Sequence, residues 1–142
     1  ESTVFYSAFF TAVIARQGTL NTPYLIQSIR NVFKIPYYDH PPELLNLISE
    51  RELVFLKIRE AMETVVTHPR GTGRHSRVPF VRTAVKTGTT GSRPPGLDAV
   101  LVGFFPADQP KYAFGFKLKH AGRAEFKGAL FLKNFLQTFY NR

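Results

Sequence analysis

Three strand-like runs in the second half of the chain constrain the fold more than any other feature. They cover Val78–Thr89, Asp98–Phe105 and Lys111–Lys119, and each is rich in β-branched or aromatic residues. Two short connections join them, Pro94-Pro95-Gly96 in the first and the stretch from Pro106 to Pro110 in the second. Connections this short cannot hold a crossover helix, so the runs are predicted to form an antiparallel three-stranded meander.

Helical periodicity predicts three helices around this sheet. Residues 1–17 carry apolar side chains at helical spacing, with Ser2 or Thr3 as N-cap and Gly18 as the left-handed end. So few polar residues interrupt this segment that a buried helix is predicted. A capping box, Ser49-Glu50-Arg51-Glu52, starts a second helix that runs to Thr67. The third helix is predicted over Glu125–Tyr140.

The same periodicity predicts which helix positions face the core. In the third strand, Ala113 and Gly115 are small enough for a helix to pack closely on their face, and the third helix is assigned to it. The predicted inward residues are Leu53, Leu56, Ala61 and Val65 in the second helix, and Phe126, Ala129, Leu130, Leu132, Leu136 and Phe139 in the third.

The segment between the first two helices is predicted to hold little regular structure. Thr22–Arg30 is assigned as one short edge strand, since Pro23 near its start cannot donate to a ladder, and residues 31–48 as connection. The resulting order is helix, strand, helix, three-stranded meander, helix. This predicts an α+β fold, a helix-flanked antiparallel sheet, in a single domain over residues 1–142.

Composition narrows the choice of function. The chain has no cysteine, which excludes disulfides and Cys-based zinc sites, and its four scattered histidines give no metal-ligand spacing. Neither a cofactor nor a metal is therefore predicted. The formal charge is +9, and no acidic residue lies between Glu63 and Asp98. This basic window favours an acidic partner, such as an anionic substrate, a membrane surface or a nucleic acid.

The first strand-like run ends in Lys86-Thr87-Gly88-Thr89. A cation and hydroxyl groups at the open end of a strand suit the binding of an anion or a carboxylate, and glycine lets a ligand approach the backbone. A Walker A phosphate loop is excluded, because that loop needs glycine directly before the lysine and a helix after it. Here Val85 precedes Lys86, and a strand is predicted next.

Lys86-Thr87-Gly88-Thr89 resembles the Lys-Thr-Gly motif of the penicillin-recognising serine acyl transferases, which lies on a strand at one wall of the active-site cleft. Other segments extend the resemblance over nearly the whole chain: Gly71-Thr72-Gly73, Asp98–Ala113 and Phe5–Ile26. The chain resembles the C-terminal half of a class B penicillin-binding protein transpeptidase domain. This resemblance implies a partial penicillin-binding and β-lactamase-like fold, in which the strand at 111–119 has an unpaired edge and the helix at 125–140 is incompletely covered.

The resemblance also implies a reaction and site residues. A serine would attack the carbonyl between the two terminal D-alanines of a peptidoglycan stem peptide, and β-lactams would mimic this donor. Thr87 and Thr89 hydroxyls would bind the carboxylate, with Lys86 supplying charge beside it. The backbone N–H of Thr89 would serve the oxyanion hole, and Gly88 would leave room for the substrate.

The chain departs from the family pattern in one important way. No serine is followed three residues later by lysine, and no Ser-x-Asn motif is present. The resemblance therefore places the nucleophile outside this chain, on the N-terminal half of the same domain, and predicts that the chain alone is inactive. It also predicts a parent anchored in the inner membrane with this domain in the periplasm. Two alternatives stay open: a basic, non-catalytic module for nucleic acid or another polyanion, and a β-lactamase or penicillin-sensing relative.

Overall fold

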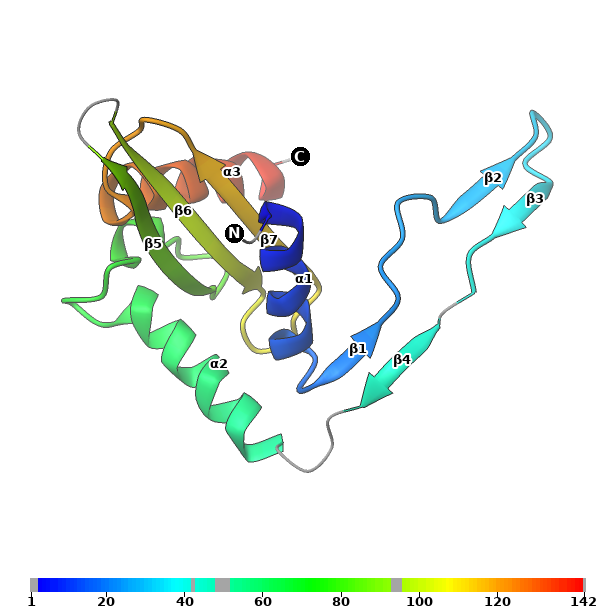
Figure 1. Cartoon of the computed structure of the whole chain (residues 1–142), viewed down its shortest axis with the longest axis horizontal. Coiled ribbons are helices and arrows are strands. Elements are labelled where there is room, and N and C mark those ends of the chain that lie inside the picture. Colours follow the sequence, from blue (N-terminus) through cyan, green and yellow to red (C-terminus); the bar gives the residue numbers. More distant parts are fainter. Residues whose placement is uncertain (1–2, 42, 48–51, 93–95, 142) are drawn as a thin grey trace.

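A three-stranded antiparallel sheet forms the centre of the molecule. The computed structural model describes residues 3–41, 43–47, 52–92 and 96–141. The sheet contains β5 (Ala84–Ser92), β6 (Gly96–Phe105) and β7 (Tyr112–Leu118), in that order. Helix α1 lies over one face and helix α3 over the other, while α2 packs beside β5 (Figure 1). The predicted antiparallel meander and the α+β fold are confirmed.

The first strand of the meander is shorter at its start than predicted. β5 begins at Ala84, and the preceding six residues from Val78 are not in a strand. Pro79 has no amide hydrogen to give to a ladder. The carbonyl of Arg82 instead accepts a hydrogen bond from the amide of Ala107, at 2.8 Å, in the turn after β6. The two prolines of the predicted turn before Gly96 lie outside the described residues.

Helix α1 (Val4–Ala15) has the predicted Thr3 cap, but it ends two residues before the predicted end at residue 17 and is not buried on all sides. The Thr3 hydroxyl accepts a hydrogen bond from the amide of Tyr6, and Gly18 has a φ of +96°. The buried positions are Thr11, Val13 and Ala15, whereas Phe5, Tyr6 and Phe10 are exposed. The prediction of a buried helix is wrong because α1 lies on one face of the sheet, and the described residues leave much of its other side uncovered.

The helix that packs against Gly115 is α1, so the assignment of the third helix to this face is wrong. A Cβ built on Gly115 would lie 3.0 Å from the carbonyl oxygen of Val4 and 3.3 Å from the amide nitrogen of Ala8. Because successive strand residues point to opposite faces, Phe114 and Phe116 lie on the other face, where α3 packs. The small residues of β7 therefore correctly predicted a close contact with a helix, but the helix is α1 and not the third helix.

The C-terminal helical segment starts with a π-helical turn (Ala124–Gly128) and continues as α3 (Ala129–Tyr140). Ala129, Leu132 and Leu136 are buried, as predicted, and they pack onto the sheet. Phe126 and Leu130 are exposed, which corrects their predicted inward positions. The prediction that the buried face of this helix is under-covered does not hold for Ala129, Leu132 and Leu136, which are at most 1% exposed.

Helix α2 (Glu52–Thr67) presents a different face to the core than predicted. Met62 and Val66 are its buried side chains, whereas Leu53 and Ala61 are exposed and the other two predicted positions are partly buried. The buried face is shifted by one residue along the sequence, from Ala61 and Val65 to Met62 and Val66. Apolar residues stand at both sets of positions, so the sequence pattern does not decide between the two faces. Residues 49–51 of the predicted capping box lie outside the described residues.

Between α1 and α2 the chain forms a long two-stranded ribbon, here called the arm (residues 19–47), which projects away from the rest of the molecule (Figure 1). Its base pairs β1 (Thr19–Asn21) with β4 (Leu44–Leu47), and its outer part pairs β2 (Ser28–Arg30) with β3 (Pro36–Asp39). The predicted single strand over Thr22–Arg30 and the predicted connection over 31–48 are both wrong.

Local hydrogen bonds explain why the arm turns where it does. The side-chain oxygen of Asn31 accepts hydrogen bonds from the amides of Phe33 and Ile35, both at 2.9 Å. Lys34 takes a positive φ of 62°, which reverses the chain. The pattern of apolar and polar residues in this segment does not reveal such a turn.

The hydrophobic core lies between the sheet and α3. Leu101 and Phe105 of β6 meet Leu132 and Leu136 of α3, and Val85 of β5 joins them; all five are at most 2% exposed. Within the described strands, β7 pairs with β6 alone, so the predicted unpaired edge is confirmed. Among the helices described, none combines the length and the apolar character needed to span a membrane.

Candidate functional site

Strand β5 is anchored in the core at its start and opens to solvent along the rest of its length. Ala84 and Val85 are fully buried, whereas the residues from Lys86 to Ser92 are partly or fully exposed. Among the described strands, β5 bonds to β6 on one side and to none on the other. Its outer edge therefore presents backbone N–H and C=O groups that another extended chain can use.

The alternation of side chains along β5 separates Lys86 from its two threonines. Thr87 and Thr89 share the face of Val85, on the side of α3, and Lys86 and Gly88 lie on the opposite face with Ala84. The Lys86 ammonium donates a hydrogen bond to the backbone carbonyl of Thr87, at 2.6 Å. The structure thus brings Thr87, Gly88 and Thr89 together at one site, with the amine of Lys86 against the strand backbone.

A cavity of about 270 Å³ opens beside this part of β5 and is called the threonine cavity below. It is bounded by β5, by the turn after α2 and by the start of the π-helical turn. Its lining residues are Thr72, Thr87, Gly88, Thr89, Arg123, Ala124 and Glu125. Three of the four predicted site residues line it, and Lys86 does not.

Thr72 is a residue of the candidate site that the sequence analysis did not single out. Its hydroxyl oxygen lies 2.7 Å from that of Thr87, and either group can be the donor. The flanking glycines make this approach possible, since a Cβ on Gly71 would overlap the carbonyl of Val65 and one on Gly73 would lie 3.2 Å from the same oxygen. The Gly-Thr-Gly sequence, which was used only as part of the family resemblance, is the signal that points to this residue.

Both threonines of β5 keep hydrogen-bonding capacity for a ligand. The Thr89 hydroxyl accepts a hydrogen bond from the amide of Ala124, at 3.1 Å, so its own proton stays available. When Thr72 donates to Thr87, the Thr87 proton is likewise available. Two hydroxyl donors on one face of a strand suit a carboxylate, which accepts hydrogen bonds through both oxygens.

Gly88 lies in the middle of the site, and packing within the chain does not require a glycine there. A Cβ at this position would meet only Val100, at 3.8 Å, which is an ordinary van der Waals distance. By contrast, Gly71 could not carry a side chain without moving the backbone of α2. A side chain at Gly88 would point to the face of β5 opposite Thr87 and Thr89, where the described residues leave room for it, so packing does not explain the glycine.

Ion pairs reduce the positive charge that the sequence suggested around this site. Arg82 binds Glu63 through two hydrogen bonds of 2.6 and 2.9 Å, and this contact raises the pKa of the Arg82 guanidinium. Arg123, at the rim of the threonine cavity, pairs with Glu125 at 3.5 Å. Arg74 donates to the carbonyl of Gly71, at 3.3 Å, and so supports the turn that carries Thr72.

No metal site accompanies the threonine cavity in the part of the chain that the structure describes. There, no three side chains among histidine, aspartate and glutamate come together to hold an ion. The donors at the site are hydroxyls and backbone groups, and these recognise anions and carbonyl oxygens by hydrogen bonding.

Solved structures share this fold over almost the full chain. The D,D-transpeptidase domain of a peptidoglycan glycosyltransferase from Eggerthella lenta is 26% identical, with a TM-score of 0.83 over 99% of this chain and 32% of that one. The penicillin-binding protein PBP2 from Helicobacter pylori is 27% identical, with a TM-score of 0.72 over 97% of this chain and 24% of its own. Penicillin-binding protein A from Mycobacterium tuberculosis, solved as an imipenem acyl-enzyme complex, is 22% identical with a TM-score of 0.77, which shows a common fold.

The chain spans about a third or less of the length of these structures. Curated proteins include no sequence match to it. The profile of the penicillin-binding protein transpeptidase domain, however, matches residues 3–136, which is most of the chain. The chain therefore belongs to the penicillin-binding protein transpeptidase domain family.

Proposed function

We propose that this chain forms one wall of the active site of a serine-type D,D-transpeptidase that cross-links peptidoglycan. The observation that carries the proposal is the threonine cavity at the open edge of β5, where Thr87, Gly88 and Thr89 meet Thr72. The acylating serine lies outside the chain, since no Ser-x-x-Lys sequence is present. The N-terminal half of the same domain supplies it.

The hydroxyls of Thr87 and Thr89 bind the terminal carboxylate of the stem peptide, or the carboxylate of a β-lactam. Both lie on one face of β5; Thr89 accepts from the amide of Ala124, and Thr87 keeps its proton for a ligand when Thr72 is the donor of their shared hydrogen bond. Hydrogen bonds to an ionised acceptor are worth roughly twice a neutral one. The threonine pair therefore fixes the position of the donor peptide relative to the nucleophile.

The backbone N–H of Thr89 acts as a donor of the oxyanion hole. Strand β5 has no partner on its outer edge among the described strands, so outward N–H groups there are available to a reacting carbonyl. Removing one such donor typically costs about 3–4 kcal/mol of transition-state stabilisation. Gly88, whose missing side chain serves no packing role in this chain, lets the substrate lie against the strand.

Lys86 acts through charge, from the opposite face of β5. Its ammonium donates a hydrogen bond to the carbonyl of Thr87, the same residue whose hydroxyl receives the carboxylate. A cation placed there favours anion binding in the threonine cavity, and the net charge of +9 adds long-range attraction for an anionic substrate. The parent protein is anchored in the inner membrane with this domain in the periplasm, where peptidoglycan and β-lactams are met.

Fluorescent penicillin labelling of the full-length protein tests these roles. We expect Thr87→Val to slow acylation at least tenfold, because it removes the hydroxyl but keeps the shape of the side chain. Thr138→Val on the exposed side of α3 is the matched control, since its hydroxyl bonds only to the carbonyl of Asn134. Equal acylation rates in Thr87→Val and Thr138→Val would contradict the carboxylate role. A label on a serine of the 142-residue chain alone would contradict the placement of the nucleophile.

Two alternatives make different predictions. A β-lactamase or penicillin-sensing relative shares the Lys-Thr-Gly motif, and the deacylation rate separates it from a transpeptidase, whose acyl-enzyme with penicillin persists. A polyanion-binding module would bind oligonucleotides in a salt-dependent way without any effect of Thr87→Val. The pairing of Arg82 with Glu63 and of Arg123 with Glu125 disfavours that module, because it interrupts the basic surface.

A further inference from the structure

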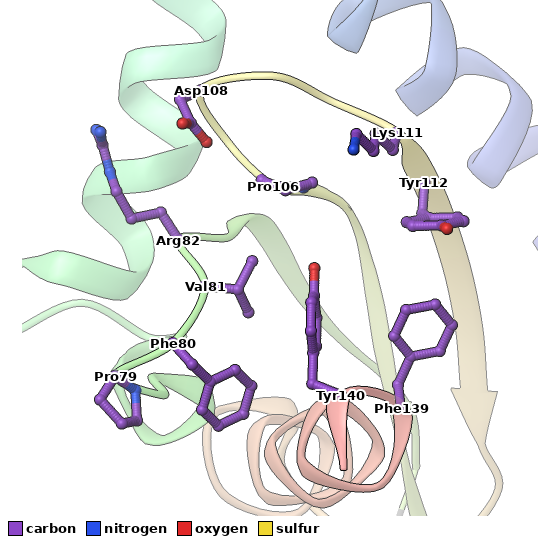
Figure 2. A pocket seen from close by; sticks show the side chains of 10 residues that line it. All are labelled: Pro79, Phe80, Val81, Arg82, Pro106, Asp108, Lys111, Tyr112, Phe139 and Tyr140. Carbon is purple, nitrogen blue, oxygen red and sulfur yellow. The ribbon is translucent and has the colours of Figure 1, made fainter. Parts of the chain in front are cut away.

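A second cavity, of about 570 Å³, lies near the turn between β6 and β7 (Figure 2). Neither the family resemblance nor the proposed reaction assigns it a role. Four aromatic residues and three charged ones line it, together with two prolines and a valine. They are Phe80, Tyr112, Phe139 and Tyr140; Arg82, Asp108 and Lys111; and Pro79, Pro106 and Val81. It is called the aromatic cavity below.

Aromatic rings form a continuous wall of this cavity. Tyr140 lies between Phe80 and Phe139, with ring centroids 5.4 Å from each, and Tyr112 lies 5.2 Å from Phe139. Phe80, Tyr112 and Tyr140 remain 46, 47 and 40% exposed. A molecule entering the cavity can therefore lie against these rings without displacing core side chains.

Three polar groups around these rings stay available to a ligand, and Asp108 acts on Arg82 only through its charge, which helps the contact with Glu63 to raise the pKa of that guanidinium. Figure 2 shows the side chains of Asp108 and Lys111 reaching toward the cavity from the β6–β7 turn, and the Tyr140 hydroxyl pointing into it. None of the three side chains makes a hydrogen bond or ion pair with another described residue. The guanidinium of Arg82, by contrast, points away toward α2, where Glu63 binds it. The cavity thus offers one carboxylate, one ammonium and one phenol.

This combination selects the chemistry of the ligand. A phosphate or other polyanion would be repelled by Asp108, and a simple cation by Lys111. A purely apolar ligand would bury these charged groups without partners, which is costly. A sugar ring meets all the requirements, because its hydroxyls donate to a carboxylate and accept from an ammonium, and its C–H face packs on aromatic rings. The volume lies in the range of pockets that take small ligands.

We propose that the aromatic cavity binds a neutral pyranose ring of a glycan, of the N-acetylhexosamine type. The sugar class follows from the cavity itself, whereas the choice of an N-acetylated sugar rests on the proposed action on peptidoglycan. Bound there, a glycan strand is held by a second contact on the same domain, separate from the threonine cavity that takes the peptide.

Binding of chitotetraose to the full-length protein, followed by calorimetry, tests this proposal. We expect Tyr140→Ala to raise the Kd at least tenfold and Asp108→Asn at least threefold. Tyr37→Ala is the matched control, because Tyr37 is an exposed tyrosine on the arm, and it should bind like the wild type. If Tyr140→Ala alters the circular dichroism spectrum, and hence the fold, Tyr140→Phe replaces it in the test. This variant removes only the hydroxyl and should raise the Kd for chitotetraose about threefold.

The proposal is overturned if the wild type shows no saturable binding, or if Tyr140→Phe and Asp108→Asn both bind chitotetraose like the wild type. It is also overturned if a D-alanyl-D-alanine peptide competes with the sugar for this cavity and binds more tightly, which would assign the cavity to peptide. Thr87→Val distinguishes the two proposals. If Tyr140→Phe weakens sugar binding while Thr87→Val acylates normally, only the transpeptidase role is contradicted. If Thr87→Val slows acylation while Tyr140→Phe binds the sugar like the wild type, only the glycan site is contradicted.

Discussion

The body of the molecule and the arm use apolar residues in opposite ways. In the body, Leu101 of β6 is completely buried between the sheet and α3, whereas Leu25 of the arm is 92% exposed. Both regions contain paired antiparallel strands, with a shift of register in the outer part of the arm between Ile29 and Arg30. The body has two faces covered by helices, and the arm has none. Backbone pairing and local side-chain contacts thus give the arm its shape, while side-chain packing in a buried core gives the body its stability.

The functional residues follow this division. The threonine cavity and the aromatic cavity are both built from segments of the body, where buried neighbours hold each side chain in place. The exposed apolar residues of the arm, by contrast, meet few side chains of the chain itself. The contrast predicts that substitutions in the body act through stability and geometry, and that substitutions in the arm leave both largely unchanged.

The largest expected difference comes from truncating one leucine in each region. Leu101→Ala removes a fully buried side chain from the core and should lower the free energy of unfolding by about 2–5 kcal/mol. Leu25→Ala should change it by less than about 0.5 kcal/mol, because little contact is lost. Urea denaturation of both variants of the full-length protein measures the difference. Similar midpoints for the two would contradict the division between body and arm.

The second test compares two glycines of the body. Gly71→Ala places a methyl group against the backbone of α2 and should cost about 1–3 kcal/mol of stability, and it should also slow acylation by displacing Thr72. Gly88→Ala fits without a clash, so its stability should stay close to that of the wild type. Its acylation should nevertheless slow if the substrate lies against β5. Denaturation midpoints and penicillin labelling together separate a glycine needed for folding from one needed for binding.

The third test concerns an acidic residue at the end of the sheet. Asp98 accepts a hydrogen bond from the amide of His120, at 2.9 Å, and pairs with Lys117 at 3.0 Å. The hydrogen bond from His120, followed by the contact with Lys117, holds the pKa of Asp98 below its ordinary value. Because the pKa of Asp98 is lower in the folded state, its carboxylate stabilises the fold at pH values above about 3.9, the pKa of an aspartate in an unfolded chain. As the pH falls below that value toward the folded-state pKa of Asp98, this stabilisation is lost.

Asp98→Asn should therefore flatten the decline in stability between about pH 4 and pH 2, and it should lower the stability at pH 7. Thermal unfolding at several pH values measures both effects. If the unfolding temperature of this variant falls between pH 4 and pH 2 as steeply as that of the wild type, Asp98 does not contribute to the loss of stability in acid.

The smallest expected effect comes from the ion pair of the arm. Arg30 and Asp39 meet at 3.1 Å across β2 and β3, and both side chains are about half exposed. Such pairs contribute up to about 1 kcal/mol, and often less, because solvent screens them. Arg30→Ala should thus leave the unfolding midpoint of the full-length protein nearly unchanged. A loss as large as that of Leu101→Ala would contradict the view that the arm is energetically separate from the body.

The sequence predicted the body well because its signals there are local and consistent. β6 and β7 were placed within two residues of their observed ends, and the short connection between them leaves only an antiparallel arrangement. The arm was mispredicted because its turn depends on the side chain of Asn31 bonding to the backbone, in a segment without alternating apolar residues. For α1, apolar residues on all sides of the helix carry no information about which side is covered.

For the candidate site, the sequence predicted the residues of one strand but not their neighbours across the cavity. Thr87, Gly88 and Thr89 stand in a recognisable motif, so their grouping was expected. Thr72 lies 15 residues away along the chain, and its contact with Thr87 exists only once α2 and β5 have packed together. The aromatic cavity gave no sequence signal, because its residues come from three segments that lie far apart along the chain.

The base of the arm also bears on how the family can vary. β1 and β4 pair directly, with Thr19 opposite Leu47, so the chain leaves the body and returns to it at the same place. Each doubling of the length of a closed loop costs only about 0.6 kcal/mol. Insertions and deletions beyond this base can therefore accumulate during evolution at little cost to the body. The arm is a position where related proteins can diverge in length while the strand that carries Thr87 stays in place.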